Sequence, residues 1–115
     1  MALTDATLNS LGTHLAGLCL YVSLHSSDPG TTGANETTAA RKAVTFSVDG
    51  DGDLTLPSTL SFTGGASSGA VTHVGLWSAS SGGTFRGGFA LTGDATFNSA
   101  GEYDVTALTI TGTTA

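Results

Sequence analysis

Few side chains in this sequence are of the types that carry out chemistry, and they stand far apart. There are three histidines, His14, His25 and His73, and one cysteine, Cys19. No histidine lies two or four residues from another suitable metal ligand, the spacing that places two ligands on one face of a strand or a helix. A single cysteine excludes both an intrachain disulfide and a multi-cysteine metal site. We therefore expect structural histidines and a buried Cys19 that acts as a small apolar residue.

Residues 65–69 match the nucleophile-elbow pattern G-x-S-x-G, with Ser67 in the nucleophile position. That motif works only on a sharp turn between a strand and a helix. The residues that follow, 70–74, have strand character, so we predict an ordinary loop at Ser67. No nucleophile, base and orienting group converge in the sequence. We predict no catalytic residue, no cofactor and no enzymatic activity.

Asp49, Asp51 and Asp53 alternate with glycines, a pattern similar to the oxygen ligands of a calcium loop. The helix–loop–helix calcium site needs glycine at its sixth position and glutamate at its twelfth. Leucines, Leu54 and Leu60, stand at those positions. We predict no metal site of that kind. Two interpretations of the tract stay open: a weak cation site, and a solvated double turn whose Asp-Gly pairs supply positive φ.

The composition argues against nucleic acid and anionic membrane surfaces as partners. Only 10% of the 115 residues are charged, the formal net charge is −6, and the only lysines and arginines are Arg41, Lys42 and Arg86. Nucleic-acid affinity depends on clustered Lys and Arg, which this chain lacks. The N-terminal region has no basic segment, and its apolar run over 15–24 is too short and too mixed for a signal peptide or a membrane span. We expect synthesis in the cytoplasm without export by the standard secretory route.

The elements that position these residues begin with one helix, predicted over 3–17. Thr4 can cap it, and Gly17 stands where a C-terminal cap would lie. Leu8, Leu11 and Leu15 follow at three- and four-residue spacing and form one apolar stripe. A stripe this narrow does not form a domain alone, so we expect it to pack on a sheet or on a neighbouring subunit.

From residue 20 the apolar period changes to two. Hydrophobic residues make up 39% of the chain and fall in short runs between Gly, Ser, Asp and Pro turns, which is typical of an all-β domain. The runs predict about seven strands, over 20–25, 43–48, 54–56, 60–62, 70–78, 84–91 and 103–111. We predict a single domain, 1–115, with a helix over 3–17 and a mainly β part over 20–111. The predicted fold is an antiparallel β-sandwich or a jelly-roll-like barrel.

Residues 26–40 form a long polar loop between two predicted strands. It opens with a turn at Asp28, Pro29 and Gly30, where Asp28 can bond its own downstream backbone and Pro29 sets φ. The loop ends at the basic pair Arg41 and Lys42. A fifteen-residue loop without periodicity is unusual in a small domain. We expect another subunit or the shell of a larger particle to order it.

Two long blocks of the sequence resemble a known class of protein. They are YVSLHSSDPGTTGANE (21–36) and VTHVGLWSASSGGTFRGG (71–88), joined by the basic pair at 41–42. With the preceding helix, they are similar to small virion proteins of tailed bacteriophages that are labelled tail-fibre, minor tail or capsid decoration proteins. The resemblance covers most of residues 3–111. It implies a place on the virion and no enzymatic role.

The chain lacks a long shaft, which favours a capsid decoration protein that assembles as a symmetric oligomer, with a trimer favoured. A tail-fibre or minor tail component is the alternative, and a glycan-binding module for host attachment is a further one. The expected partners are copies of the chain and phage capsid or tail proteins, with no nucleic acid and no membrane. The candidate assembly contacts are Leu8, Leu11, Leu15, Asp28, Pro29, Gly30, Arg41 and Lys42.

Overall fold

The computed structural model describes residues 4–49, 52–91, 95–106 and 108–110. These residues form one helix and nine short strands, and every strand pair is antiparallel. The elements are α1 (Asp5–Leu18), β1 (Tyr21–His25), β2 (Lys42–Ala43), β3 (Ser47–Val48), β4 (Leu54–Thr55), β5 (Leu60–Phe62), β6 (His73–Trp77), β7 (Phe85–Ala90), β8 (Tyr103–Val105) and β9 (Thr109–Ile110). The predicted mainly β, antiparallel fold with one N-terminal helix is confirmed.

The helix begins two residues later than the predicted range 3–17 and ends one residue later, with the predicted Thr4 as its cap. Thr4 has an extended backbone and its Oγ1 accepts a hydrogen bond from the Thr7 N–H at 3.2 Å, so it is the N-cap. Gly17 lies inside the last turn instead of capping it. The N–H of Cys19 still donates to the Leu15 carbonyl at 3.0 Å, but its own backbone has left the helical region. The helix therefore ends at Cys19, which leads the chain into β1.

The largest sheet has the strand order β2-β1-β6-β7. Its centre is the β1–β6 pair, in which Ser23 lies opposite Gly75 and His25 opposite His73. The hairpin predicted over 70–91 is confirmed as β6 and β7, with a register irregularity between Leu76 and Trp77.

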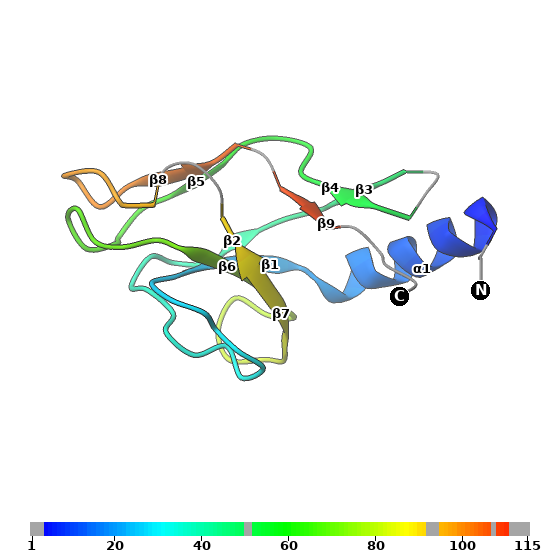
Figure 1. Cartoon of the computed structure of the whole chain (residues 1–115), viewed down its shortest axis with the longest axis horizontal. Coiled ribbons are helices and arrows are strands. Elements are labelled where there is room, and N and C mark those ends of the chain that lie inside the picture. The colour runs from blue at the N-terminus through cyan, green and yellow to red at the C-terminus, as the bar shows by residue number, and fades with distance from the viewer. Residues whose placement is uncertain (1–3, 50–51, 92–94, 107, 111–115) are drawn as a thin grey trace.

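Two smaller sheets, β3-β4-β9 and β5-β8, lie along one side of this sheet (Figure 1). They divide two strands that the sequence predicts as continuous. The run over 43–48 contributes β2 to one sheet and β3 to another, and the run over 103–111 contributes β8 and then β9. Each division occurs where the chain stops pairing with one strand and begins to pair with another. The apolar residues keep alternating through this point, so the sequence pattern does not reveal the division. Residues 107 and 111 of that run lie outside the described part of the chain.

One hydrophobic core lies between the four-stranded sheet and the two smaller ones. The larger sheet contributes alternate residues such as Val22, Leu24 and Val74, all 0% exposed, and the smaller sheets contribute Leu54 and Phe62, also 0% exposed. Burial of such side chains is the main favourable term in folding. The layered arrangement agrees with the sandwich that the sequence predicts.

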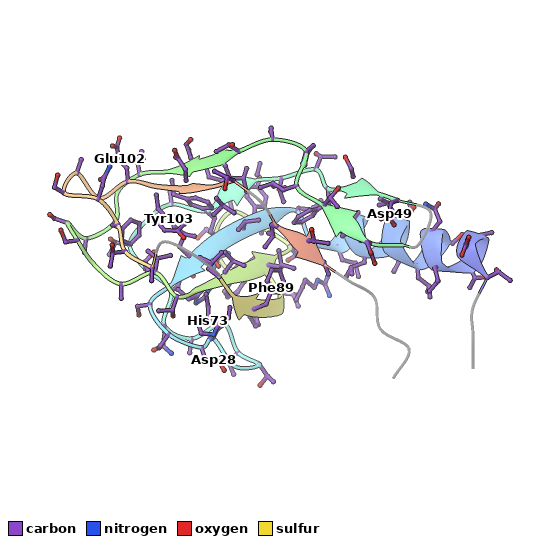
Figure 2. All side chains as sticks on the ribbon, turned by 45° about the horizontal axis from the view of Figure 1, so that its top comes forward. Asp28, Asp49, His73, Phe89, Glu102 and Tyr103 are labelled. Atoms are coloured by element: carbon purple, nitrogen blue, oxygen red, sulfur yellow. The ribbon has the colours of Figure 1, made fainter. Side chains whose placement is uncertain are left out.

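The molecule is elongated, with extents of 46 × 24 × 23 Å. Helix α1 forms one end of the long axis, and the turn that leads into β8 forms the other, as Figure 1 shows. Figure 2 labels Glu102 at this second end, far from α1. The two ends therefore differ in structure: one is helical and the other is made of loops.

Candidate functional site

The four-stranded sheet is covered on both faces. Four of the five residues of β1, and four of the five of β6, are buried. Successive residues of a strand point to opposite faces, so one set faces the core and the other needs a second cover. That second set forms what we call the outer face: Ser23, His25, Gly75, Trp77 and Phe85.

The cover over the outer face is the 26–40 loop. Pro29 is buried, and a Cβ placed on Gly88 would lie only 2.6 Å from its ring. A Cβ on Gly33 would come within 2.5 Å of the Trp77 ring, and Gly33 has a φ of 78°. Only glycine permits both this backbone and this approach. The loop is thus in close contact with the sheet at Pro29 and Gly33, while most of its other residues are exposed.

A chain of buried hydrogen bonds ties the loop to the outer face. Nδ1 of His25 lies 2.7 Å from the Ala34 carbonyl oxygen, which can only accept, so Nδ1 carries the proton. Nε2 must then accept, and the Ser23 hydroxyl donates to it at 2.6 Å. The same hydroxyl oxygen accepts from the indole Nε1 of Trp77 at 2.8 Å. Every donor and acceptor in the series from Trp77 to Ala34 is satisfied.

Burial lowers the pKa of His25, against smaller opposing effects from its hydrogen bond to Ala34 and from the Glu36 carboxylate. The neutral ring agrees with the tautomer that the hydrogen bonds require. Ser23 and His25 lie at the distance of a nucleophile and its base. Both side chains are 0% exposed, however, so this pair has no surface that a substrate could reach. In this structure, the Ser23–His25 pair binds the 26–40 loop to the sheet through the Ala34 carbonyl.

Arg41 holds the far end of the loop. Its Nε and Nη2 donate to the two oxygens of Glu36 at 2.8 and 2.9 Å. Its Nη1 donates to the carbonyls of Ala79 and Gly82 at 3.0 and 2.9 Å, and its guanidinium carbon lies 3.7 Å from the centre of the Trp77 ring. One side chain thereby joins the loop, the connection between β6 and β7, and the outer face.

The turn at the start of the loop forms as its sequence predicts. Oδ1 of Asp28 accepts from the Gly30 N–H at 2.9 Å, and Gly30 has a φ of 62°. The carbonyl of Pro29 then accepts from Gly33 and Ala34, both at 3.1 Å. Contacts within one chain hold the loop against the sheet, and its expected contact with a neighbouring subunit or with the shell stays a prediction. Assembly contacts through Asp28, Pro29, Gly30, Arg41 and Lys42 stay a prediction.

The described ends of the aspartate tract, Asp49 and Asp53, are hydrogen-bonded to each other, and Asp49 is also bonded to the helix. Oδ1 of Asp49 accepts from the Asp53 N–H at 2.9 Å, and the Asp49 carbonyl accepts from the Asn9 side chain at 2.8 Å. Asp51 lies outside the described residues. Within the part of the chain that the structure describes, no three His, Cys, Asp or Glu side chains are grouped so that they could hold a metal ion.

The other residues that the sequence singles out are dispersed. Ser67 lies on an exposed loop that leads to the bridge between Ala70 and Thr96, not to a helix. Cys19 is 0% exposed, and burial raises the pKa of its thiol, with a smaller opposing effect from Arg86. His14 is exposed on α1, and His73 is half-buried beside the Thr72 hydroxyl. No two of these side chains are brought together in one site.

The apolar stripe of α1 is only partly covered. Leu8 and Leu15 are half-buried, whereas Leu11 is 55% exposed. The residue that the body covers best is Gly12, the single buried residue of α1. A Cβ on Gly12 would lie 2.5 Å from the Gly52 carbonyl oxygen and 2.8 Å from Cγ1 of Val48. Hydrophobic spacing alone did not reveal this contact. A glycine between two leucines of the stripe was the one sequence feature that could have indicated a close approach to the helix.

A hollow of about 400 Å³ opens beside β5 and β8, at the loop end of the molecule. It is lined by Ser61, Phe62, Thr63, Asn98, Glu102, Tyr103 and Asp104. Its two aromatic residues, Phe62 and Tyr103, are 0% and 7% exposed, so their rings serve the core. A sugar-binding platform would need such rings to be exposed.

Comparison with known proteins places this architecture in a family. No helix among the described residues is long and apolar enough to cross a membrane. No individual curated protein matches the sequence. Residues 2–113 match the family described as Podophage GP4 fiber I protein gp80. This match spans nearly the whole chain and agrees with the phage resemblance of the two sequence blocks. The chain therefore belongs to the Podophage GP4 fiber I protein gp80 family of phage fibre-type virion proteins.

Proposed function

We propose that this protein is a structural subunit of a tail-associated phage fibre and that it acts as a symmetric homo-oligomer, with three copies in the assembly. The observation that carries the proposal is the family match over residues 2–113, whose description names a fibre protein. That description favours the tail-fibre alternative over capsid decoration, the first expectation from the chain's short length. The proposed partners are copies of the chain and tail proteins of the particle.

The geometry supports a structural role in two ways. The residues best suited to chemistry, Ser23, His25 and Arg41, are engaged in holding the loop to the sheet. The elongated molecule also has one helical end and one loop end, which suits a subunit that is attached at one end and directed outward at the other. A rigid, pre-ordered loop limits the entropy cost of any contact that it makes.

Copy number and position on purified virions test this proposal. Quantitative mass spectrometry against the major capsid protein should give a few or some tens of copies per particle. Gold-labelled antibody should bind at the tail. Hundreds of copies spread over the shell would instead establish capsid decoration. Absence of the protein from purified virions would contradict both assignments.

A further inference from the structure

The leucines of α1 follow a heptad pattern. Leu8, Leu11, Leu15 and Leu18 are separated by three, four and three residues, which places them at successive a and d positions. This spacing makes a seam along one side of a helix, and such seams pair with copies of themselves. Leu11, at the centre of the seam, is a d position.

The rest of the molecule half-buries three leucines of this seam and leaves Leu11 exposed. The helix packs through Gly12 against Gly52 and Val48, next to Leu8 and Leu15. Leu11 is 55% exposed, and Leu18 is half-buried. Figure 1 and Figure 2 show α1 extending along the long axis away from the four-stranded sheet, so its uncovered side is accessible from outside.

The chemistry of the uncovered side identifies what should cover it. Asp5 is the only charged residue in the fourteen residues of α1. A partner recognised through charge would find only Asp5 there, whereas identical helices would meet with a single like charge each, at their N-terminal ends. A helix of fourteen residues is marginally stable in water by itself. Its own chain buries only Gly12 fully, and packs Leu15 and Ala16 partly against the core.

We propose that α1 is the self-association element of this protein: copies of the chain pack their α1 helices side by side and in parallel, with Leu11 at the centre of the contact. Parallel packing follows from a closed cyclic oligomer whose axis runs along the helices. The inference rests on the proposed homo-oligomer and adds the surface that forms it. In the oligomer, each helix contacts the rest of its own chain through Gly12 and contacts the helices of neighbouring copies through Leu11.

Sedimentation equilibrium of the full chain tests the role of Leu11. Leu11→Asp should raise the dissociation constant of the oligomer at least about tenfold, because each copy loses a buried leucine and gains a charge at the contact. Ser10→Asp is the matched control, since Ser10 is exposed and turned about 100° around the helix from Leu11. It should leave the dissociation constant within about twofold. A monomeric wild type, or equal effects of the two variants, would overturn the inference.

Cysteine cross-linking gives a second test that does not depend on weakening the oligomer. Native Cys19 is 0% exposed, so Leu11→Cys adds the accessible thiol of α1. On mild oxidation, Leu11→Cys should form disulfide-linked pairs, and Ser10→Cys should stay largely unlinked. Equal linkage of the two variants, or none for Leu11→Cys in a proven oligomer, would overturn the helix contact. Neither result alters the position and copy number measured on virions, so failure here is distinguishable from failure of the fibre assignment.

Discussion

Arg41 is one of three basic residues in the chain, and the fold uses it almost entirely inside the molecule. Its side chain is 8% exposed, and it makes two hydrogen bonds to Glu36 and two to backbone carbonyls while it stacks on Trp77. A planar guanidinium can do all of this at once, because its donors lie in one plane and its face is free to stack. Arg41 is also a candidate assembly contact from the sequence, and that role stays a prediction.

Replacing Arg41 by lysine should lower the free energy of unfolding by about 2 kcal/mol, since lysine keeps the charge but loses the two-pronged bond to Glu36 and the stacking on Trp77. Urea unfolding followed by Trp77 fluorescence measures this change. Arg86→Lys, the same substitution at an exposed position of β7, should change stability by less than about 0.5 kcal/mol. Equal effects at the two sites would show that the geometry at Arg41 is unimportant.

The buried His25 predicts a pH dependence of stability. Its pKa is lowered by burial, so between that lowered value and the ordinary value near 6.5 the unfolded chain binds a proton that the folded chain does not. Stability should therefore be fully present above about pH 6.5 and fall as the pH drops through this window. Urea titrations at several pH values measure the slope. His25→Gln should flatten it, and an unchanged slope in this variant would mean that His25 is not the group responsible.

At the scale of elements, α1 is attached to the body through two glycines. Gly12 lies at the centre of the packed face, and Gly52, with a φ of 79°, lies directly against the Leu8 carbonyl. Such a close approach of two backbones leaves no room for a Cβ on either side. The hairpin of β3 and β4 therefore sets the position of the helix.

Gly12→Ala should destabilise the protein by about 1–3 kcal/mol, as expected for an added methyl group in a closed contact, although alanine has the better helix propensity. Gly17→Ala is the matched control, because a Cβ at Gly17 meets nothing within 4 Å. It should stabilise the protein by about 0.5–1 kcal/mol. Thermal unfolding measured by circular dichroism separates the two. A stabilising Gly12→Ala would mean that helix and hairpin are not in close contact.

At the scale of the whole molecule, the net charge of −6 is carried with only three basic residues. One of those, Arg41, is paired inside the fold with Glu36. Copies that come together in an oligomer therefore repel one another over distances of a Debye length, about 10 Å at 0.1 M salt. Association depends on apolar contact strong enough to exceed this repulsion.

Raising NaCl from about 0.02 M to about 0.5 M should strengthen self-association by roughly two- to tenfold, because salt screens like charges and leaves apolar burial intact. Sedimentation velocity at several salt concentrations measures the effect. Lys42→Glu, which lowers the net charge from −6 by two, should make the dependence steeper. Weaker association at high salt would mean that ion pairs between copies dominate the contact.

The local features of this protein could be predicted from its sequence. The Thr4 cap, the turn at Asp28, Pro29 and Gly30, and the β6–β7 hairpin follow from residues close together in the chain. The mainly β class follows from the same short-range alternation. Family membership was indicated by the two long blocks and is confirmed by the match over 2–113.

What lies on the second face of the main sheet could not be predicted from local patterns, because it depends on contacts between segments far apart in the chain. The contact of Trp77 with Ser23 joins residues 54 positions apart, and that of Arg41 with Gly82 joins residues 41 apart. Alternation predicts that a strand has two faces, but not that the 26–40 loop will fold back over the second one. The same limit applies to Gly12 and Gly52, and to the two divided strands. Each depends on which distant segment packs nearby, and local periodicity carries no information about that choice.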